Sequence, residues 1–276
     1  MDMNSLMVLV PALAITGLAA GTLAGLLGVG GGIVIVPVLR YLLVWTGVDE
    51  SVAMHLAVGT SLATIIPTSI ISMRSHHARG GVDWDIFKGW FPGIALGCIA
   101  GGVLAKFLNT AQLTAVFGII AFCVALQLAL SKDKKTTDGD EAPPRPLGLP
   151  LTAGVSGFVG LVSSLMGIGG GSLTVPILTW RDWPIRRAVG TASSIGLIIA
   201  IWATASFIWA GWGVDALPDH AIGYVSWLGF ALIVPFTMLA APFGAKLAHT
   251  LPTGQLRKAF ALFLGIVSIK MMSDLL

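Results

Sequence analysis

The stretch that decides the fold is GVGGGIVIVPVL, residues 28–39, and it occurs again as GIGGGSLTVPIL at residues 167–178. Seven of the twelve positions are identical. A second motif, AVGT, follows each copy, at residues 57–60 and 188–191. Motifs that recur in the same order predict an internal repeat. We therefore divide the chain into a first membrane repeat at residues 1–130, a linker at 131–148 and a second membrane repeat at 149–276.

The composition indicates that both repeats lie in a membrane. Hydrophobic residues make up 55% of the chain and charged residues 11%, and the mean hydropathy is +0.89. So few charges could not cover the surface of a soluble protein. The apolar runs lack strict alternation, which favours helices over a barrel. The net charge of +3 is too small to indicate a nucleic-acid partner. We predict an all-α integral membrane protein that is surrounded by the lipid bilayer.

Ten apolar segments are expected to form helices, five in each repeat. In the first repeat they span residues 6–27, 33–45, 52–73, 86–108 and 113–130, and in the second 149–166, 172–180, 188–210, 222–247 and 259–272. Glycines at 28–32 and 167–171 separate the first two segments of each repeat. Because each glycine destabilises a helix by about 1 kcal/mol, the sequence predicts a helical hairpin that is broken at the glycines. The first segment has no basic residue before it, so we expect it to be retained rather than cleaved as a signal peptide.

The positions of Lys and Arg predict how the segments cross the membrane. All 16 except Arg40, Lys106 and Lys270 can be placed on one side, which the positive-inside rule assigns to the cytoplasm. The linker and the loop at 181–187 are then both cytoplasmic, so the segments at 149–180 enter and leave on the same side. Each repeat becomes a glycine-broken helical hairpin plus three transmembrane helices. Because three is odd, the two repeats are expected to be inverted relative to each other, as in many secondary transporters.

The paired glycine breaks predict a site for an anion. The helix that restarts after each break presents unpaired N–H groups and the positive end of its dipole, and the missing Cβ atoms let a ligand approach the backbone. The alternative is that the glycines only allow tight helix packing. The candidate binding residues are Gly30, Gly31, Gly32, Gly169, Gly170 and Gly171.

Polar residues near the AVGT motifs extend this candidate site. The hydroxyls could donate to an oxyanion or bond back to their own helix. His55 and Arg186 occupy equivalent positions two residues before each motif, where they could face an anion or lie at the level of the headgroups. These added candidates are His55, Thr60, Ser61, Arg186, Thr191, Ser193 and Ser194.

The sequence carries no pattern that indicates enzyme chemistry. Cys98 and Cys123 both lie within apolar segments and predict neither a disulfide nor a metal site. Nucleotide-binding and metalloprotease motifs are absent. We therefore expect no catalytic residue, no cofactor and no bound metal.

The paired GxGGG…VP hairpins, the AVGT segments and the HxxxGxVDW-like stretch from His76 to Trp84 resemble the TauE/SafE sulfite exporter family. The second repeat lacks a clear copy of the HxxxGxVDW-like stretch and has WGVD at residues 212–215 instead. The resemblance implies a multi-pass carrier in the bacterial inner membrane that moves sulfite, a sulfonate or a sulfoacetate-like organic anion.

Together these observations favour a secondary transporter that works by alternating access. The driving force would be a proton gradient, with protons as the coupling ion, or the gradient of the substrate itself. The alternative is an anion channel with a filter of glycine backbone. Whether the chain forms a homo-oligomer stays open.

The topology can be tested with reporter tags. A tag or a reactive cysteine in the linker at 131–145 should be cytoplasmic, and both chain termini should face the opposite side. Reagent accessibility in intact cells measures this. Two cytoplasmic termini would contradict the inverted arrangement.

Overall fold

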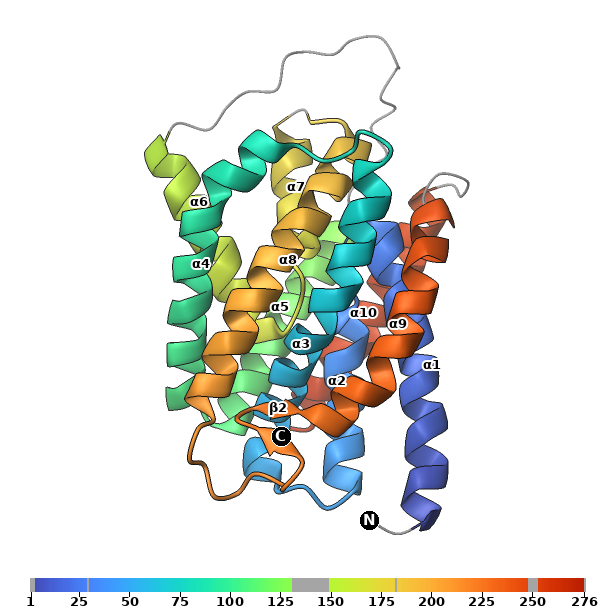
Figure 1. Ribbon diagram of the computed structural model, residues 1–276, viewed down its shortest axis with the longest axis vertical. Helices are drawn as coiled ribbons and strands as arrows, with labels where there is room; N and C mark the ends of the chain where they lie inside the picture. The colour runs from blue at the N-terminus through green and yellow to red at the C-terminus, as the bar shows by residue number, and fades with distance from the viewer. Residues whose placement is uncertain (1–2, 29, 131–148, 182, 248–252, 276) are drawn as a thin grey trace.

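The computed structural model describes residues 3–28, 30–130, 149–181, 183–247 and 253–275, and it is a bundle of long helices (Figure 1). The predicted linker at 131–148 lies outside the described residues. The helices are α1 (Met3–Leu27), α2 (Gly32–Trp45), α3 (Glu50–His77), α4 (Trp84–Phe107), α5 (Thr110–Leu130), α6 (Leu149–Met166), α7 (Gly171–Trp180), α8 (Ile185–Ala210), α9 (Trp227–Leu247) and α10 (Thr253–Ser273). The prediction of an all-α membrane protein is confirmed.

Six helices are long and apolar enough to cross a membrane, namely α1, α3, α4, α5, α8 and α9. The helices that flank the glycine breaks differ in length. Before the first break, α1 has 25 residues; at the second break, α6 has 18 residues and α7 has 10. At about 1.5 Å per residue, α7 reaches only part of the way through a bilayer. The chain is therefore a multi-pass membrane protein in which some helices turn back inside the bundle.

A small β-hairpin replaces the start of one expected helix. The segment predicted as a helix from residue 222 begins as α9 only at Trp227, and it is preceded by β1 (Ala221–Ile222) and β2 (Val225–Ser226). The expected start was wrong because Gly223 takes a φ of +54°, which turns the chain back on itself. Two residues per strand are too few for alternation to reveal them in an apolar sequence.

The two ends of the bundle differ in charge, and we name them accordingly. Among the described residues, one end of the bundle has four acidic residues in or next to its loops, and we call it the acidic end: Asp49, Glu50, Asp215 and Asp219. We call the opposite end the basic end, because it holds Arg74, Arg79 and Arg187. Figure 1 shows the start of α1 at the acidic end, α6 entering the bundle from the basic end and α7 returning to that end. This arrangement agrees with what inverted repeats would produce, and the inversion itself stays a hypothesis.

The main helix pairs join one half of the chain to the other. They are α1 with α9, α4 with α6, α3 with α8 and α5 with α10. Each helix of one half has a counterpart in the other half. If every helix is replaced by its counterpart, the α1–α9 pair becomes the α6–α4 pair, and the α3–α8 and α5–α10 pairs stay the same. Neither half therefore buries its own apolar faces alone.

A buried ion cluster ties α2 to the end of the chain. Arg40 is only 5% exposed, and its guanidinium lies 3.3 Å from Asp274 and 3.6 Å from Glu50. Asp274 also accepts a hydrogen bond from the Tyr41 hydroxyl at 2.5 Å. A buried charge needs such partners, and Asp274 also pairs with Lys270 at 2.8 Å, which explains how these two basic residues can lie at the acidic end of the bundle.

Glycine at position 97 is predicted to be necessary for the α4–α6 contact. A Cβ there would collide with the Gly157 carbonyl oxygen, whereas a Cβ at Gly89 in the same helix would meet no atom within 4 Å. We expect Gly97→Val to destabilise the protein by about 1–3 kcal/mol or more, seen as a lower melting temperature and folded yield. Gly89→Val is the matched control and should melt like the wild type. Equal melting of the two variants would contradict this packing.

Candidate functional site

The two glycine breaks meet at the centre of the bundle. A Cβ on Gly30 would lie 3.2 Å from the Gly169 Cα atom, and a Cβ on Gly32 would collide with the Gly167 carbonyl oxygen. Ser61 reinforces the contact because its hydroxyl donates to that same carbonyl oxygen at 2.8 Å. We call this contact between the breaks the glycine crossing. Tight packing on small residues, the alternative considered for these glycines, is therefore present, and a ligand site would have to exist beside it.

The two breaks have different backbone conformations. In the first, Gly28, Gly30 and Gly31 have φ values of +69°, +78° and +75°, which side-chain-bearing residues rarely adopt. In the second, only Gly167 does so, at +66°, while Gly170 has an ordinary φ of −58°. Position 31 therefore requires glycine for its backbone, and position 170 does not.

A new helix starts directly after each break. The Gly31 carbonyl accepts from the N–H groups of Val34 and Ile35 at 3.1 and 3.3 Å, and the Gly170 carbonyl accepts from Thr174 at 2.7 Å. The N–H groups at the start of α2 and of α7 lie in the first turn, where no carbonyl of the same helix can accept from them. The positive ends of the α2 and α7 dipoles thus point toward the glycine crossing.

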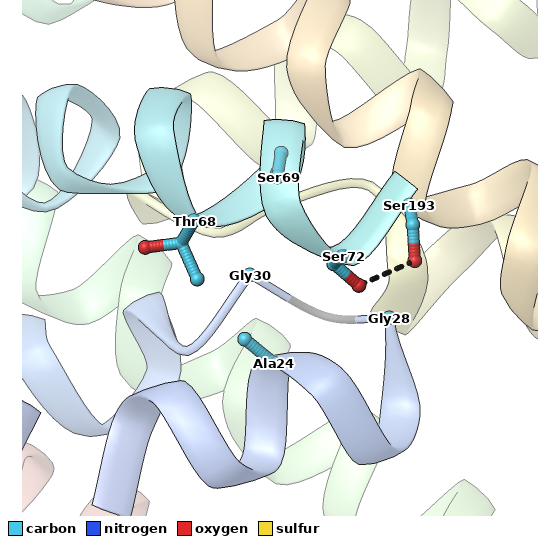
Figure 2. Close-up of a pocket in the computed structure, with 7 residues that line it drawn as sticks. All are labelled: Ala24, Gly28, Gly30, Thr68, Ser69, Ser72 and Ser193. Carbon is cyan, nitrogen blue, oxygen red and sulfur yellow. Dashed lines mark hydrogen bonds between the residues drawn. The ribbon is translucent and has the colours of Figure 1, made fainter. Parts of the chain in front are cut away.

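A small hollow lies beside the crossing, on its side toward the basic end (Figure 2). Ala24, Gly28, Gly30, Thr68, Ser69, Ser72 and Ser193 line it. The space between these atoms amounts to about 150 Å³, and none of it is wide enough for a water molecule. Figure 2 shows the Ser72 and Ser193 hydroxyls facing each other next to Gly28.

The hydroxyls of the hollow are held by weak bonds that a ligand could replace. Ser72 donates to the Ser193 oxygen at 3.1 Å, and Ser193 donates to the Val189 carbonyl at 3.1 Å. Thr68 is different, because its hydroxyl bonds to Thr64 and Thr237 and its methyl group faces Gly30 (Figure 2). Four residues with hydroxyl groups line the hollow, of which Ser72 and Ser193 face each other, and none of the lining residues carries a charge.

The predicted site residues do not all lie together. Gly30 and Ser193 line the hollow, and Gly32 and Ser61 belong to the glycine crossing. Ser194 donates to the Thr191 carbonyl of its own helix at 2.7 Å. The remaining predicted residues have other packing partners. Gly31 packs on Ala20, Gly169 faces Gly30, Gly170 faces Ile195 and Ile199, and Gly171 begins α7.

The AVGT threonines bind backbone at opposite ends of the bundle. Thr60 accepts from the Ser226 N–H at 2.8 Å, and Thr191 accepts from the Asp83 N–H at 3.0 Å. Both side chains are fully buried. Their role as anion ligands stays a prediction.

His55 lies in the acidic-end half of α3 and holds the end of a neighbouring helix. Its Nε2 is 3.1 Å from the Ala105 carbonyl oxygen and 3.0 Å from that of Leu108. Because both neighbours are acceptors, Nε2 must carry the proton and donate. Its ring packs on Tyr224 with 4.7 Å between centroids. The side chain of Arg186, its predicted counterpart, lies outside the described part of the chain.

Five residues that line the hollow were not predicted as site residues. Ala24 and Gly28 lie at or before the first glycine break, and Thr68, Ser69 and Ser72 lie on α3 beyond the AVGT motif. The hydroxyls at 61, 64, 68 and 72 recur at helical spacing, so they form a stripe on one face of α3. That periodicity is the signal that could have identified Thr68 and Ser72.

The fold reveals a counterpart of the HxxxGxVDW-like stretch in the second repeat. The structural counterpart of the loop before α4 is the loop before α9, so residues 220–227, HAIGYVSW, match residues 77–84, HARGGVDW. Residues 212–215, which the sequence offered in place of a clear copy, precede this loop. The shared positions are only five of eight, too sparse to stand out without the fold.

The described residues contain no group of three or more His, Cys, Asp or Glu side chains that could hold a metal ion. Among those same residues, the candidate site thus consists of hydroxyls, peptide groups and helix dipoles. Such a set can bind and orient an anion.

Comparisons with known proteins agree with this description. The family model described as "Sulfite exporter TauE/SafE" matches residues 13–271. A protein of Haemophilus influenzae named "Probable membrane transporter protein" is 36% identical, covering 93% of this chain and 96% of its own. A probable membrane transporter protein of Bacillus subtilis is 30% identical over 93% of both chains, and one of Methanocaldococcus jannaschii is 29% identical over 96% of both. No solved structure matches. Because the family model covers nearly the whole chain, this protein belongs to the TauE/SafE family of membrane transporters, which is not a class of enzymes.

Proposed function

We propose that this transporter moves a small sulfur-containing oxyanion, such as sulfite, a sulfonate or a sulfoacetate-like organic anion, by alternating access. The observation that carries the proposal is the hydroxyl-lined hollow beside the glycine crossing. The crossing brings the N-termini of α2 and α7 together, each equivalent to about +0.5 charge. Two half-charges match a monoanion, and the Ser72 and Ser193 hydroxyls supply donors for its oxygens.

The hydroxyl stripe of α3 has no counterpart on α8, which supports a single binding site on the side of the crossing that α3 lines. Aligning the AVGT motifs places Thr64, Thr68 and Ser72 of α3 opposite Ile195, Ile199 and Ala203 of α8. Ile195 and Ile199 are fully buried and would contact a Cβ on Gly170 at 2.9 and 2.8 Å. An oxyanion would lose hydrogen bonds against these isoleucines. We therefore assign the site to the basic-end side of the crossing.

Movement of the helices is needed before an anion can enter. The hollow is too narrow for water, and a three-oxygen anion is larger. Backbone groups pack directly at the crossing, so a passage forms only when the two halves shift. This requirement favours a carrier with moving halves over the alternative of an anion channel with a glycine filter. Arg74, Arg79 and Arg187 at the basic end would attract the anion toward the hollow.

Removing the hydroxyls of the hollow should weaken anion binding. A hydrogen bond to a charged group contributes about 1.5–3 kcal/mol, so Ser72→Ala and Ser193→Ala should each raise the Kd for sulfite roughly tenfold or more. The measurement is the sulfite-dependent rise in melting temperature of the purified protein. Ser268→Ala is the matched control, because that buried serine bonds only to the Gly265 carbonyl of its own helix. Unchanged affinity in both hollow variants would remove the hollow from the site.

Transport in proteoliposomes tests the function as a whole. External sulfite should drive counterflow of labelled sulfite from loaded vesicles, since a carrier exchanges bound substrate across the membrane. Sulfonates should compete, whereas choline should not, because neutral donors and positive dipole ends bind only anions. Flux that never saturates and lacks counterflow would indicate the channel. Competition by choline at the same concentrations would contradict an anion site.

A further inference from the structure

Two loops with matching sequences lie at opposite ends of the bundle. Residues 77–84 read HARGGVDW and lead into α4, and residues 220–227 read HAIGYVSW and lead into α9. Each loop follows the helix that carries the AVGT motif of its own half. The loops thus occupy equivalent places in the two halves, and Figure 1 shows β2 of the second loop at the acidic end.

Each loop inserts its backbone into the other half of the protein. The Tyr224 carbonyl lies so close to Gly59 that a Cβ there would collide with its oxygen, and the Gly81 carbonyl lies equally close to Gly190. Two residues further along each loop, a backbone N–H donates to the threonine of the motif. The Ser226 N–H donates to Thr60 at 2.8 Å, and the Asp83 N–H donates to Thr191 at 3.0 Å. We call these contacts the acidic-end latch (Gly59–Thr60 with Tyr224–Ser226) and the basic-end latch (Gly190–Thr191 with Gly81–Asp83).

The AVGT motif therefore has one structural task in both halves. Its glycine makes room for a carbonyl of the opposite loop, and its threonine accepts an N–H of the same loop. Because the loop N–H is donated to a buried oxygen, losing the acceptor leaves an unpaired peptide group in the closed arrangement. Both latches therefore join the first half of the chain to the second half.

Different side chains reinforce the two latches. At the acidic end the Tyr224 ring packs on His55, at 4.7 Å between centroids, and on Phe207, at 6.4 Å. At the basic end the Asp83 carboxylate lies 3.3 Å from Arg187 and also accepts from the N–H groups of Asp85 and Ile86. The acidic-end latch is thus mainly aromatic, and the basic-end latch is mainly ionic.

We propose that the two latches are the gates of the transport path, one at each end, and that Thr60 and Thr191 are positioning residues that hold them closed. The inference rests on the proposed alternating-access function, since a carrier must open one end while the other stays closed. The hollow lies between the latches, so each latch separates it from one side of the membrane. Opening an end breaks the hydrogen bond to its threonine and withdraws the loop from the AVGT glycine.

Thiol labelling at matched positions tests which end each threonine controls. In a background of Cys98→Ala and Cys123→Ala, Ser72→Cys reports on the basic-end side and Ala203→Cys, its equivalent on α8 by the AVGT alignment, reports on the acidic-end side. We expect Thr191→Val to speed labelling at position 72 about fivefold and leave position 203 unchanged. Thr60→Val should do the reverse. Fivefold is the population change that corresponds to about 1 kcal/mol for one lost hydrogen bond.

Three controls separate gating from damage and from anion binding. Thr60→Ser and Thr191→Ser keep the acceptor oxygen and should label like the parent. Thr114→Val removes a buried hydroxyl that bonds only to the Thr110 carbonyl of its own helix at 2.7 Å, and it should leave both positions unchanged. Labelling without any anion reads the gates, whereas the sulfite-dependent melting shift reads the site, so failure of one proposal is distinguishable from failure of the other. Unselective labelling, or a lost melting shift with unchanged labelling, would overturn the gate assignment.

Cysteine pairs provide a second test, in which a reversible crosslink holds each latch closed. Thr60→Cys with Ser226→Cys, and Thr191→Cys with Asp83→Cys, place two thiols across each latch. Oxidation should stop sulfite counterflow in either pair and slow labelling only on the crosslinked side, and a reductant should restore both. Full counterflow with a crosslink formed would overturn the proposal.

Discussion

The close approach of two peptide backbones at the glycine crossing is the constraint on which the rest of the structure depends. Gly30 and Gly32 of one half meet Gly167 and Gly169 of the other with no space for a Cβ. Peptide groups at this depth cannot bond to water in lipid, so irregular backbone is tolerated only where protein surrounds it. The long helices of both halves surround the crossing itself.

Contacts across the halves then determine how the remaining segments are placed. Each main helix pair takes one member from each half, and each AVGT motif receives a loop from the opposite half. A rearrangement at one end therefore changes contacts between the same two bodies at the other. This mutual dependence is a physical basis for coupling, because one rigid shift biases both ends.

Similar backbones in the two halves carry different side chains, and this difference makes the two sides of the glycine crossing chemically unequal. The stripe of hydroxyls on α3 corresponds to isoleucine and alanine on α8. The first glycine break has three left-handed residues and the second has one. The stripe of α3 therefore supplies hydroxyls to the basic-end side of the crossing, whereas the matching positions of α8 are apolar.

The sequence alone determined the membrane class, the doubled glycine break and the number and approximate extent of the helices, because these depend on local apolar length and on residues that break helices. It also identified Gly30, Ser61 and Ser193, since they lie in or near motifs that recur. It did not reveal that Ser72 faces Ser193, that Thr60 and Thr191 accept N–H groups from distant loops, or that residues 221–226 form a hairpin. The contacts of Ser72, Thr60 and Thr191 join residues more than a hundred positions apart, such as Thr60 with Ser226, and the hairpin is fixed where its loop packs on the other half. Only the tertiary structure decided them, because only packing of one half on the other brings their atoms within hydrogen-bonding distance.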